Sequence, residues 1–304
     1  MTSDRRIFIS PDSTFVVAEN GPMRLVIRGW RRERFRTEAV LETAEYAFSC
    51  LAQVAGCLSV LKGRISGEAA GSLPTVCRNM CESVAAVGDE DLTPMASVAG
   101  AIADEVADYL FKRIGQGGAG PVKVIVDNGG DLAVRLSGGA RATVGLRPDL
   151  NAPGLSHKME LDSSPGIYGV NTSGMGGRSF TRGIASAATV LAPVSSAADA
   201  AATAIANACF HEDENIVRVP AGQLDPHTDI PDIPVTLRAA DLNPETVEKA
   251  LAAAVDKAET LKAAGLIHGA FIACGNRTAM TRIDHARIVP LAGNRPSPER
   301  KNQP

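Results

Sequence analysis

The stretch SSAADAAATAIANAC, residues 195–209, decides how the rest of this sequence is interpreted. It predicts a helix built almost wholly of Ala and Ile, with a polar stripe of Ser196, Asp199, Thr203 and Asn207. These residues recur every three or four positions, so they lie along one face of the helix. Asp199 and Thr203 are one turn apart, and a carboxylate beside a hydroxyl suits a magnesium ion whose remaining ligands are phosphate and water.

A helix cap is a second interpretation of the same residues. Ser196 followed by Asp199 fits a capping box, with Ser at the N-cap and an acid in the first turn. On spacing alone the cap is the more common explanation. The choice between a helix cap and a metal site therefore depends on the segments that precede this helix.

Composition excludes several classes of protein. The chain has 304 residues, of which 45% are hydrophobic, so it can bury a sizeable core as two domains or as one duplicated domain. It carries 31 Lys and Arg against 34 Asp and Glu, and 4% aromatic residues, which argues against a dedicated nucleic-acid binder. No apolar leader and no uninterrupted apolar run of about 18 residues is present, so we expect no membrane span.

The cysteines and histidines give no transition-metal signature. None of the six cysteines forms a CxxC pair, and most lie in apolar surroundings that are typical of buried free thiols. The five histidines are dispersed, without a recognised ligand pair. We therefore expect a cytoplasmic protein with reduced thiols.

Periodicity predicts long helices separated by short strands. Helices are expected over residues 37–62, 93–114, 195–210 and 244–264. The second and the last open with Thr93-Pro94 and Asn243-Pro244, each a helix-start signal. The strands between them show no regular β-α-β alternation, so the expected class is α+β rather than a doubly wound parallel sheet. The expected strands are RIFIS, TFVVA, MRLVIRGW, VKVIVD, DLAVRL, ARATVGLR, GIYGVNTS, GAFIACG and AMTRID.

Two segments with a similar pattern indicate that the chain contains a duplicated unit. VKVIVDNGGDLAV and IHGAFIACGNRTAM each follow a long helix, and each reads as strand, glycine-containing turn and strand. We predict one domain over residues 1–290, made of two repeats at about 1–150 and 151–290. The polar, Pro-rich residues 291–304 are expected to be a disordered tail.

The first loop with chemical potential is VDNGGDLAV. Asn128 and Gly129 between apolar runs are a strong signal for a β-hairpin turn. The turn and a ligand site are compatible, because Gly129 and Gly130 also let a ligand approach the backbone closely. Asp131 would project a carboxylate at the same place.

The second loop is VNTSGMGGRSFTRG, residues 170–183. Hydroxyls from Thr172 and Ser173, free backbone at Gly174 and a cation at Arg178 would make an anion cradle. The alternative is a mobile glycine loop between strands. A cluster of arginines raises a similar choice between a solvated strand edge and helix start, which is the more common case, and a clamp for a carboxylate or phosphate. The cluster comprises Arg24, Arg28, Arg31, Arg32, Arg34 and Arg36.

Taken in order, four segments resemble the ApbE family, whose characterised members are FAD:protein FMN transferases. The segments are VDNGGD, TVGLRPD, VNTSG and AADAAATAIANA, which follow the family's Gly-Gly-acid turn, strand end, T-S-G strand and alanine-rich helix. The likeness covers about residues 120–210 and is closest to the short, cytoplasmic, largely uncharacterised branch of ApbE-like proteins. It implies duplicated T-fold-like units with antiparallel sheets and paired helices.

The resemblance also implies a site. Asp199 and Thr203 would bind Mg²⁺, which orients the diphosphate of FAD for transfer of FMN to a Thr of an acceptor protein. Asp131 and Asp199 would be the catalytic residues that position the attacking group. Gly129 and Gly130 would line the nucleotide pocket, with Thr172 and Ser173 beside it. Together with the two loops described above, the expected cofactor-binding residues are Asn128, Gly129, Gly130, Thr172, Ser173, Gly174 and Arg178.

The chain departs from the family pattern in one interval. The family carries an H-x-I-x-D-P-x-T-G segment between the T-S-G strand and the helix, whereas MGGRSFTRGIASAATVLAPVSS contains no His, Asp or Glu. A similar LDPHTDIP occurs at 224–231, after the helix. Because it is out of order, we interpret it as a chance likeness or a rearranged loop.

Three functions stay open at this point. The first is a magnesium-dependent transferase acting on FAD, FMN or another anionic nucleotide, with an acceptor protein as partner. The second is a diverged, hydrolase-type enzyme that acts on a small anionic metabolite through ring opening or sulfur assimilation. The third is a non-catalytic flavin-binding or assembly protein. Neither nucleic acid nor a membrane is an expected partner, and an oligomer remains open.

Overall fold

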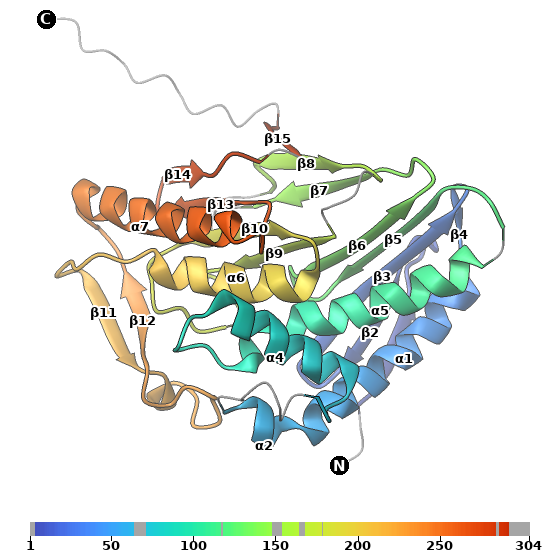
Figure 1. The fold of residues 1–304 in the computed structure, drawn as a ribbon, viewed down its shortest axis with the longest axis horizontal. Coiled ribbons are helices and arrows are strands. Elements are labelled where there is room, and N and C mark those ends of the chain that lie inside the picture. Colours follow the sequence, from blue (N-terminus) through green and yellow to red (C-terminus); the bar gives the residue numbers. More distant parts are fainter. Residues whose placement is uncertain are drawn as a thin grey trace, which may run out of the picture.

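The structure is a computed structural model that describes residues 4–63, 71–116, 118–147, 154–163, 168–177, 179–283 and 286–291. A large antiparallel sheet runs through the molecule, and the long helices cover one of its faces (Figure 1). The expected combination of helices with antiparallel sheets is confirmed. Of the predicted tail, residues 292–304 lie outside the described part of the chain.

The large sheet has ten strands in the order β1-β2-β3-β5-β6-β9-β10-β13-β14, with β4 paired to β3. Its strands are β1 (Arg6–Ile9), β2 (Val16–Asn20), β3 (Met23–Arg31), β4 (Arg34–Phe35), β5 (Val122–Asp127), β6 (Leu132–Ser137), β9 (Gly169–Ser173), β10 (Ala187–Ala192), β13 (Gly269–Cys274) and β14 (Arg277–Met280). A three-stranded sheet consists of β7 (Ala142–Leu146), β8 (His157–Leu161) and β15 (Arg287–Pro290). A separate hairpin pairs β11 (Ile216–Pro220) with β12 (Pro234–Ala239).

The small sheet packs on the face of the large sheet that is opposite the helices. Side chains alternate along β6, so Val134 points to one face while Ala133 and Arg135 point to the other. Val134 belongs to a core cluster with Val144 of β7 and Met159 of β8. Ala133 belongs to the core beneath the helices. The large sheet is therefore covered on both faces along its middle strands.

The helices differ from the prediction at three places. They are α1 (Thr37–Gly56), α2 (Leu58–Leu61), α4 (Thr75–Val87), α5 (Val98–Gly115), α6 (Ser195–Ala208) and α7 (Pro244–Ala263). The helix expected over 37–62 breaks at Cys57, and α4 is not among the predicted helices. The helix expected from Thr93 begins as a 3-10 turn, η1 (Pro94–Ser97), before α5; the Thr93 hydroxyl accepts a hydrogen bond from the Met95 N–H at 3.2 Å.

The order of elements is similar in the two halves of the chain. In the first half, the β2–β3 hairpin is followed by helices that include α1 and α5, and then by the β5–β6 hairpin. In the second half, the β9–β10 hairpin is followed by α6 and α7, and then by the β13–β14 hairpin. β6 pairs with β9, which joins the two halves into one sheet.

Helix α6 lies at the centre of the helical layer, where it contacts α4, α5, α7, β9 and β10 (Figure 1). Small side chains make this close packing possible. A Cβ atom at Gly100 would lie 2.4 Å from the carbonyl oxygen of Ser195, and one at Gly169 would lie 2.5 Å from the Cα of Ser195. Alanine has a small side chain and a high helix propensity, so the alanine-rich sequence of α6 both allows this close packing and favours the helix.

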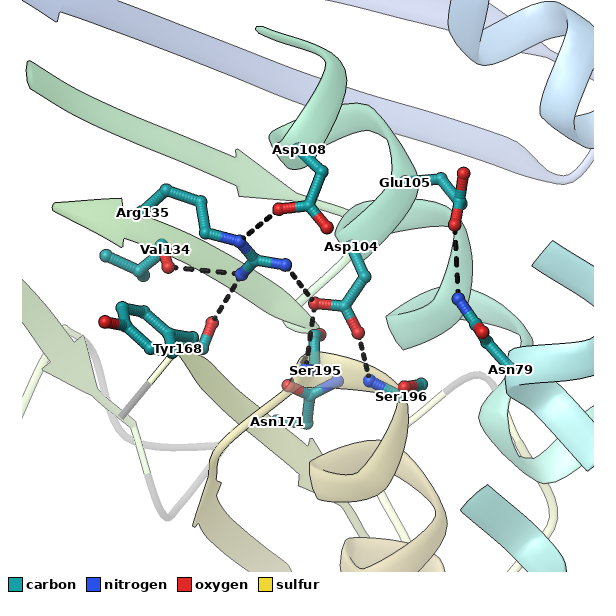
Figure 2. A network of polar contacts seen from close by, with 10 residues as sticks. All are labelled: Asn79, Asp104, Glu105, Asp108, Val134, Arg135, Tyr168, Asn171, Ser195 and Ser196. Carbon is teal, nitrogen blue, oxygen red and sulfur yellow. Dashed lines mark hydrogen bonds and ion pairs between the residues drawn. The ribbon is translucent and has the colours of Figure 1, made fainter. Parts of the chain in front are cut away.

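The N-terminus of α6 is capped by a carboxylate from α5. Asp104 accepts hydrogen bonds from the backbone N–H groups of Ser195, at 3.0 Å, and Ser196, at 2.8 Å (Figure 2). The N-cap residue itself is Val194, which makes no side-chain cap. The capping box formed by Ser196 and Asp199 is therefore wrong, because the acceptor comes from a different helix.

Asp104 also pairs with Arg135 of β6 in a buried cluster (Figure 2). The Arg135 Nη2 lies 2.9 Å from the Asp104 Oδ1, and the two side chains are only 10% and 6% exposed. The guanidinium also donates to Asp108 at 2.6 Å and to the carbonyl oxygens of Val134 and Tyr168. Because each charge is both paired and hydrogen-bonded, the penalty of burying it is offset.

The six cysteines are free thiols, as the sequence predicts. Across the described residues, the search for a helix both long and apolar enough to span a bilayer gives no candidate.

We expect Asp104→Ala to lower the free energy of unfolding by about 3 kcal/mol. The substitution removes the cap of α6 and leaves Arg135 with only the half-exposed Asp108 as an acidic partner. Urea denaturation followed by circular dichroism measures the change. The control is Glu42→Ala, which breaks an exposed pair with Arg113 and should lower stability by less than about 1 kcal/mol. Equal losses in the two variants would contradict a central role for Asp104.

Candidate functional site

Eight of the ten candidate site residues line one cavity of about 350 Å³, named here the inner cavity. It lies among the start of α5, the β5–β6 turn, the end of β9 and one face of α6. Its lining includes Asn128, Gly129, Asp131, Thr172, Ser173, Gly174, Asp199 and Thr203. Gly130 lines an adjoining cleft instead, and Arg178 lies outside the described residues.

The predicted hairpin turn between β5 and β6 is confirmed, and it is fixed against α5. The Asn128 side-chain amide donates to the carbonyl oxygen of Ala99 at 3.1 Å, and the Gly130 N–H donates to the Asp127 carboxylate at 2.9 Å. Gly129 and Gly130 have φ angles of 74° and 107°, which only glycine adopts without strain. The turn is therefore held rigidly at the cavity.

The end of β9 contributes hydroxyls and a tightly packed glycine. The Thr172 and Thr189 hydroxyls are hydrogen-bonded across β9 and β10 at 2.9 Å. Gly174 has a φ of 153°, and a Cβ there would lie 2.6 Å from the carbonyl oxygen of Ser186. Ser173 is buried between these two positions and lines the cavity. A larger residue at position 174 would push β9 away from the site.

Asp199 caps α5 in the same way that Asp104 caps α6. Its Oδ2 accepts a hydrogen bond from the Gly100 N–H, in the first turn of α5, at 2.8 Å. Burial raises the pKa of Asp199 to about 7; hydrogen bonds from Gly100 and Ala99 oppose the rise, and the nearby Asp104 adds to it. A carboxyl group with a pKa near neutrality in a cavity can exchange a proton or accept a cation.

The inner cavity offers hard oxygen ligands without forming a complete cage for a metal. Asp131, Asp199 and Thr203 all line it. Among the residues that the structure describes, no group of three or more His, Cys, Asp or Glu could hold a metal ion. Magnesium usually keeps water and phosphate oxygens beside one or two carboxylates. These residues therefore fit a magnesium ion that takes part of its coordination from a bound ligand.

A larger space of about 930 Å³, named here the outer cleft, adjoins the inner cavity on the side of the small sheet. Gly129, Thr172, Ser173, Gly174 and Gly177 line both spaces, so the two meet there. The walls of the outer cleft also carry Arg24 and Arg28 of β3, and Arg147 directly after β7.

Four residues of the arginine cluster form two pairs with different surroundings, and the other two, Arg34 and Arg36, are exposed. Arg31 and Arg32 donate to the main-chain carbonyl oxygens of Ile114, Gly118 and Ala119. Arg24 and Arg28 instead line the outer cleft. Of the two pairs, Arg24 and Arg28 are the one whose position is compatible with the predicted anion clamp.

Sequence reasoning missed one neighbour of the site. A side cavity of about 290 Å³ shares Thr203 with the inner cavity, and its far wall is formed by Asp225, His227 and Asp229. The Thr93 hydroxyl donates to Asp229 and anchors this wall. These three residues belong to LDPHTDIP. From its late position in the chain, we interpreted this segment as a chance likeness or a rearranged loop. In the structure it lies at the edge of the site.

We expect the raised pKa of Asp199 to appear as a pH dependence of stability. The unfolded carboxyl group titrates near 3.8 and the folded one near 7, so the folded state holds an extra proton between these values. The resulting stabilisation is present at pH 4 and is lost as the pH rises through 7. Asp199→Asn stays neutral and keeps an acceptor for the Gly100 N–H, so it should lack this decline.

Urea denaturation of both proteins at about pH 4, 6 and 8, at fixed ionic strength, measures the effect. The unfolding free energy of Asp199→Asn relative to the unmodified chain should rise with pH, by up to about 1.4 kcal/mol per unit, and level off above pH 7. Parallel stability curves would contradict the raised pKa.

Comparisons with known proteins support a family assignment. Residues 7–282 match the family described as AbpE bacteria. A UPF0280 protein of Methanopyrus kandleri is 43% identical over 121 residues, which cover 40% of this chain and 44% of the relative. UPF0280 proteins of Methanocaldococcus jannaschii and Methanospirillum hungatei are 37% identical over 124 residues (40% and 46% covered) and 35% identical over 159 residues (51% and 58% covered).

The chain spans about half the length of the curated relatives it matches. The match of residues 7–282, by contrast, extends over nearly the whole chain, from β1 to the end of β14. On this match, the chain belongs to the AbpE bacteria family.

Proposed function

We propose that this protein binds a flavin nucleotide, FAD or FMN, in the joined inner cavity and outer cleft. One observation carries the proposal. The residues that the ApbE resemblance assigns to the nucleotide, including Gly129, Thr172 and Ser173, line one cavity together with Asp199 and Thr203. They come from three separate segments of the chain, so their meeting is a property of the fold.

We further propose that the chain is a short-branch ApbE-like protein made of two T-fold-like units, at about 1–150 and 151–290. The repeated order of hairpin, helices and hairpin supports this interpretation, as does the pairing of β6 with β9 between the halves.

Transfer of FMN to an acceptor protein is the activity that this site would serve. Magnesium, when bound by Asp199 and Thr203, would supply positive charge that neutralises the diphosphate. The hydroxyls of Thr172 and Ser173 would donate hydrogen bonds to the ligand, and Gly129 and Gly174 allow it to approach the backbone closely. Asp131 would position the attacking hydroxyl group and accept its proton, while the P–O–P bond of FAD breaks and AMP leaves.

A diverged enzyme that acts on a small anionic metabolite is the second candidate. The observation that favours it is the set of arginines in the outer cleft, Arg24, Arg28 and Arg147, whose guanidinium groups suit carboxylates and phosphates. A non-catalytic flavin-binding protein would use the same cleft without transfer.

We expect the purified protein to bind FAD and FMN, with quenching of flavin fluorescence and a raised melting temperature. Incubation with FAD, Mg²⁺ and a Thr-containing acceptor, read by mass spectrometry, tests the transfer. Binding with transfer supports the transferase. Binding without transfer favours the non-catalytic function, and absence of flavin binding favours the anionic-metabolite enzyme.

We also expect Mg²⁺ to bind weakly alone and at least about tenfold more tightly when ADP or FAD is present. The reason is that the inner cavity supplies only part of the coordination. Isothermal titration calorimetry measures both affinities. Asp199→Asn keeps the cap of α5 but lacks the charge, and Thr203→Val lacks the hydroxyl, so each should reduce the gain. Asp225→Asn, in the side cavity, is the control. Tight Mg²⁺ binding without ligand that survives Asp199→Ala would show that the site lies elsewhere.

A further inference from the structure

The outer cleft is a slot with apolar walls between the two packed sheets. The small sheet contributes its edge strand, β7, and the large sheet contributes β5, β6 and β9. The apolar side chains that line the slot are Ile125, Leu132, Val144, Leu146, Leu155 and Val170. At about 930 Å³, it is near the upper end of the range of about 300–1,000 Å³ for ligand pockets. A flat ring therefore fits between these walls.

Leu155 lies at the mouth of this slot, across the strand β7. Its side chain is 51% exposed, although it is large and apolar. It lies directly over Gly145, where a Cβ atom would be 2.3 Å from the Leu155 Cδ1. The adjacent Ser156 N–H donates to the carbonyl oxygen of Leu146 at 3.0 Å, which holds the segment against β7. A ring bound in the slot would cover Leu155 and remove its apolar surface from water.

The two arginines of β3 in the outer cleft already have partners. Arg24 is paired with Glu19 at 2.9 Å, and the guanidinium of Arg28 stands 5.0 Å from the centre of the Phe15 ring. Such a guanidinium still offers N–H donors, which suit the carbonyl oxygens on one edge of an isoalloxazine ring.

The inner cavity provides the other half of a nucleotide site. Asp199 and Thr203 are the proposed ligands of a magnesium ion there, and that ion would hold the phosphate groups. The segment from Thr172 to Gly174 lines both spaces. A chain that leaves the metal-bound phosphate can therefore pass this segment into the slot.

We propose that the isoalloxazine ring of the flavin lies in the outer cleft, between the two sheets and under Leu155, while its phosphate groups lie in the inner cavity at Asp199 and Thr203. Leu155 is then a positioning residue for the ring, and Gly145 is required because only glycine leaves room for it. The proposal rests on the proposed function for the flavin itself.

Riboflavin tests the slot because it has the ring and the chain but no phosphate. Binding is measured by fluorescence quenching in buffer with EDTA. Leu155→Ala should weaken riboflavin binding at least about fivefold, because it removes the apolar cover of the ring. Leu155→Met keeps that cover and should stay within about twofold of the unmodified chain.

Gly145→Ala is an independent variant of the same contact. Gly145 lies within β7, and the three atoms nearest to its added Cβ all belong to Leu155. The substitution should displace Leu155 and weaken riboflavin binding, whereas in a Leu155→Ala background it should add less than about a twofold loss.

Leu237→Ala is the matched control. Leu237 lies on β12, is 53% exposed and is not among the residues lining the outer cleft. It should leave the riboflavin affinity within about twofold. If Leu155→Ala and Leu237→Ala have equal effects, or if neither Leu155→Ala nor Gly145→Ala weakens riboflavin binding, the proposal is overturned.

Inorganic pyrophosphate with Mg²⁺ tests the orientation, and isothermal titration calorimetry measures its binding. Leu155→Ala should leave the pyrophosphate affinity within about twofold, because the phosphate groups lie in the other space. A loss of pyrophosphate affinity without a loss of riboflavin affinity would mean that the slot holds the anion, and it would overturn the proposal.

Adenosine and FMN separate this proposal from the proposed function. If neither riboflavin nor FMN binds, but adenosine binds and loses affinity in Leu155→Ala, the flavin assignment fails and the ring slot stands. If a flavin binds with an affinity that Leu155→Ala and Gly145→Ala leave unchanged, the flavin assignment stands and the slot fails. If none of these three probes binds, both are overturned.

Discussion

Helices α5 and α6 each cap the N-terminus of the other with an aspartate side chain, and this pair of caps stabilises the centre of the molecule. Asp104 of α5 accepts hydrogen bonds from the first N–H groups of α6, and Asp199 of α6 accepts one from the N–H of Gly100 in α5. Each helix start would otherwise carry unpaired donors in a tightly packed region. The helices can approach this closely because Gly100 has no side chain. Arg135 balances the charge of Asp104, which ties the helical layer to the sheet.

The same pair of helix caps positions the elements of the candidate site. Asp199 of α6 caps the first turn of α5. The start of α5, the β5–β6 turn and the end of β9 therefore meet around one cavity beside α6. Asp199 therefore has two roles: it holds α5, and it supplies a carboxyl group whose pKa burial raises to about 7. The outer cleft meets this cavity at Gly129, Thr172 and Ser173, so one ligand can occupy both spaces.

Local signals predicted part of this structure well. Asn243-Pro244 marks the start of α7, and the glycines after Asn128 mark the β5–β6 turn, because caps and turns depend on a few adjacent residues. The pairing of β15 with β8, such as Ile288 with Met159, joins distant segments and leaves no local pattern. The cap from Asp104 was missed for the same reason. Its one signal was a pair of acids one turn apart in the predicted helix, Asp104 and Asp108, which both pair with Arg135 in the structure.

The central claim is that a nucleotide occupies the joined cavity and cleft. A crystal structure of the protein with bound FMN tests it most directly. The account predicts that the flavin contacts the segment from Thr172 to Gly174, which lines both spaces, with Asp199 and Thr203 in the same cavity. A flavin bound away from both spaces would contradict it.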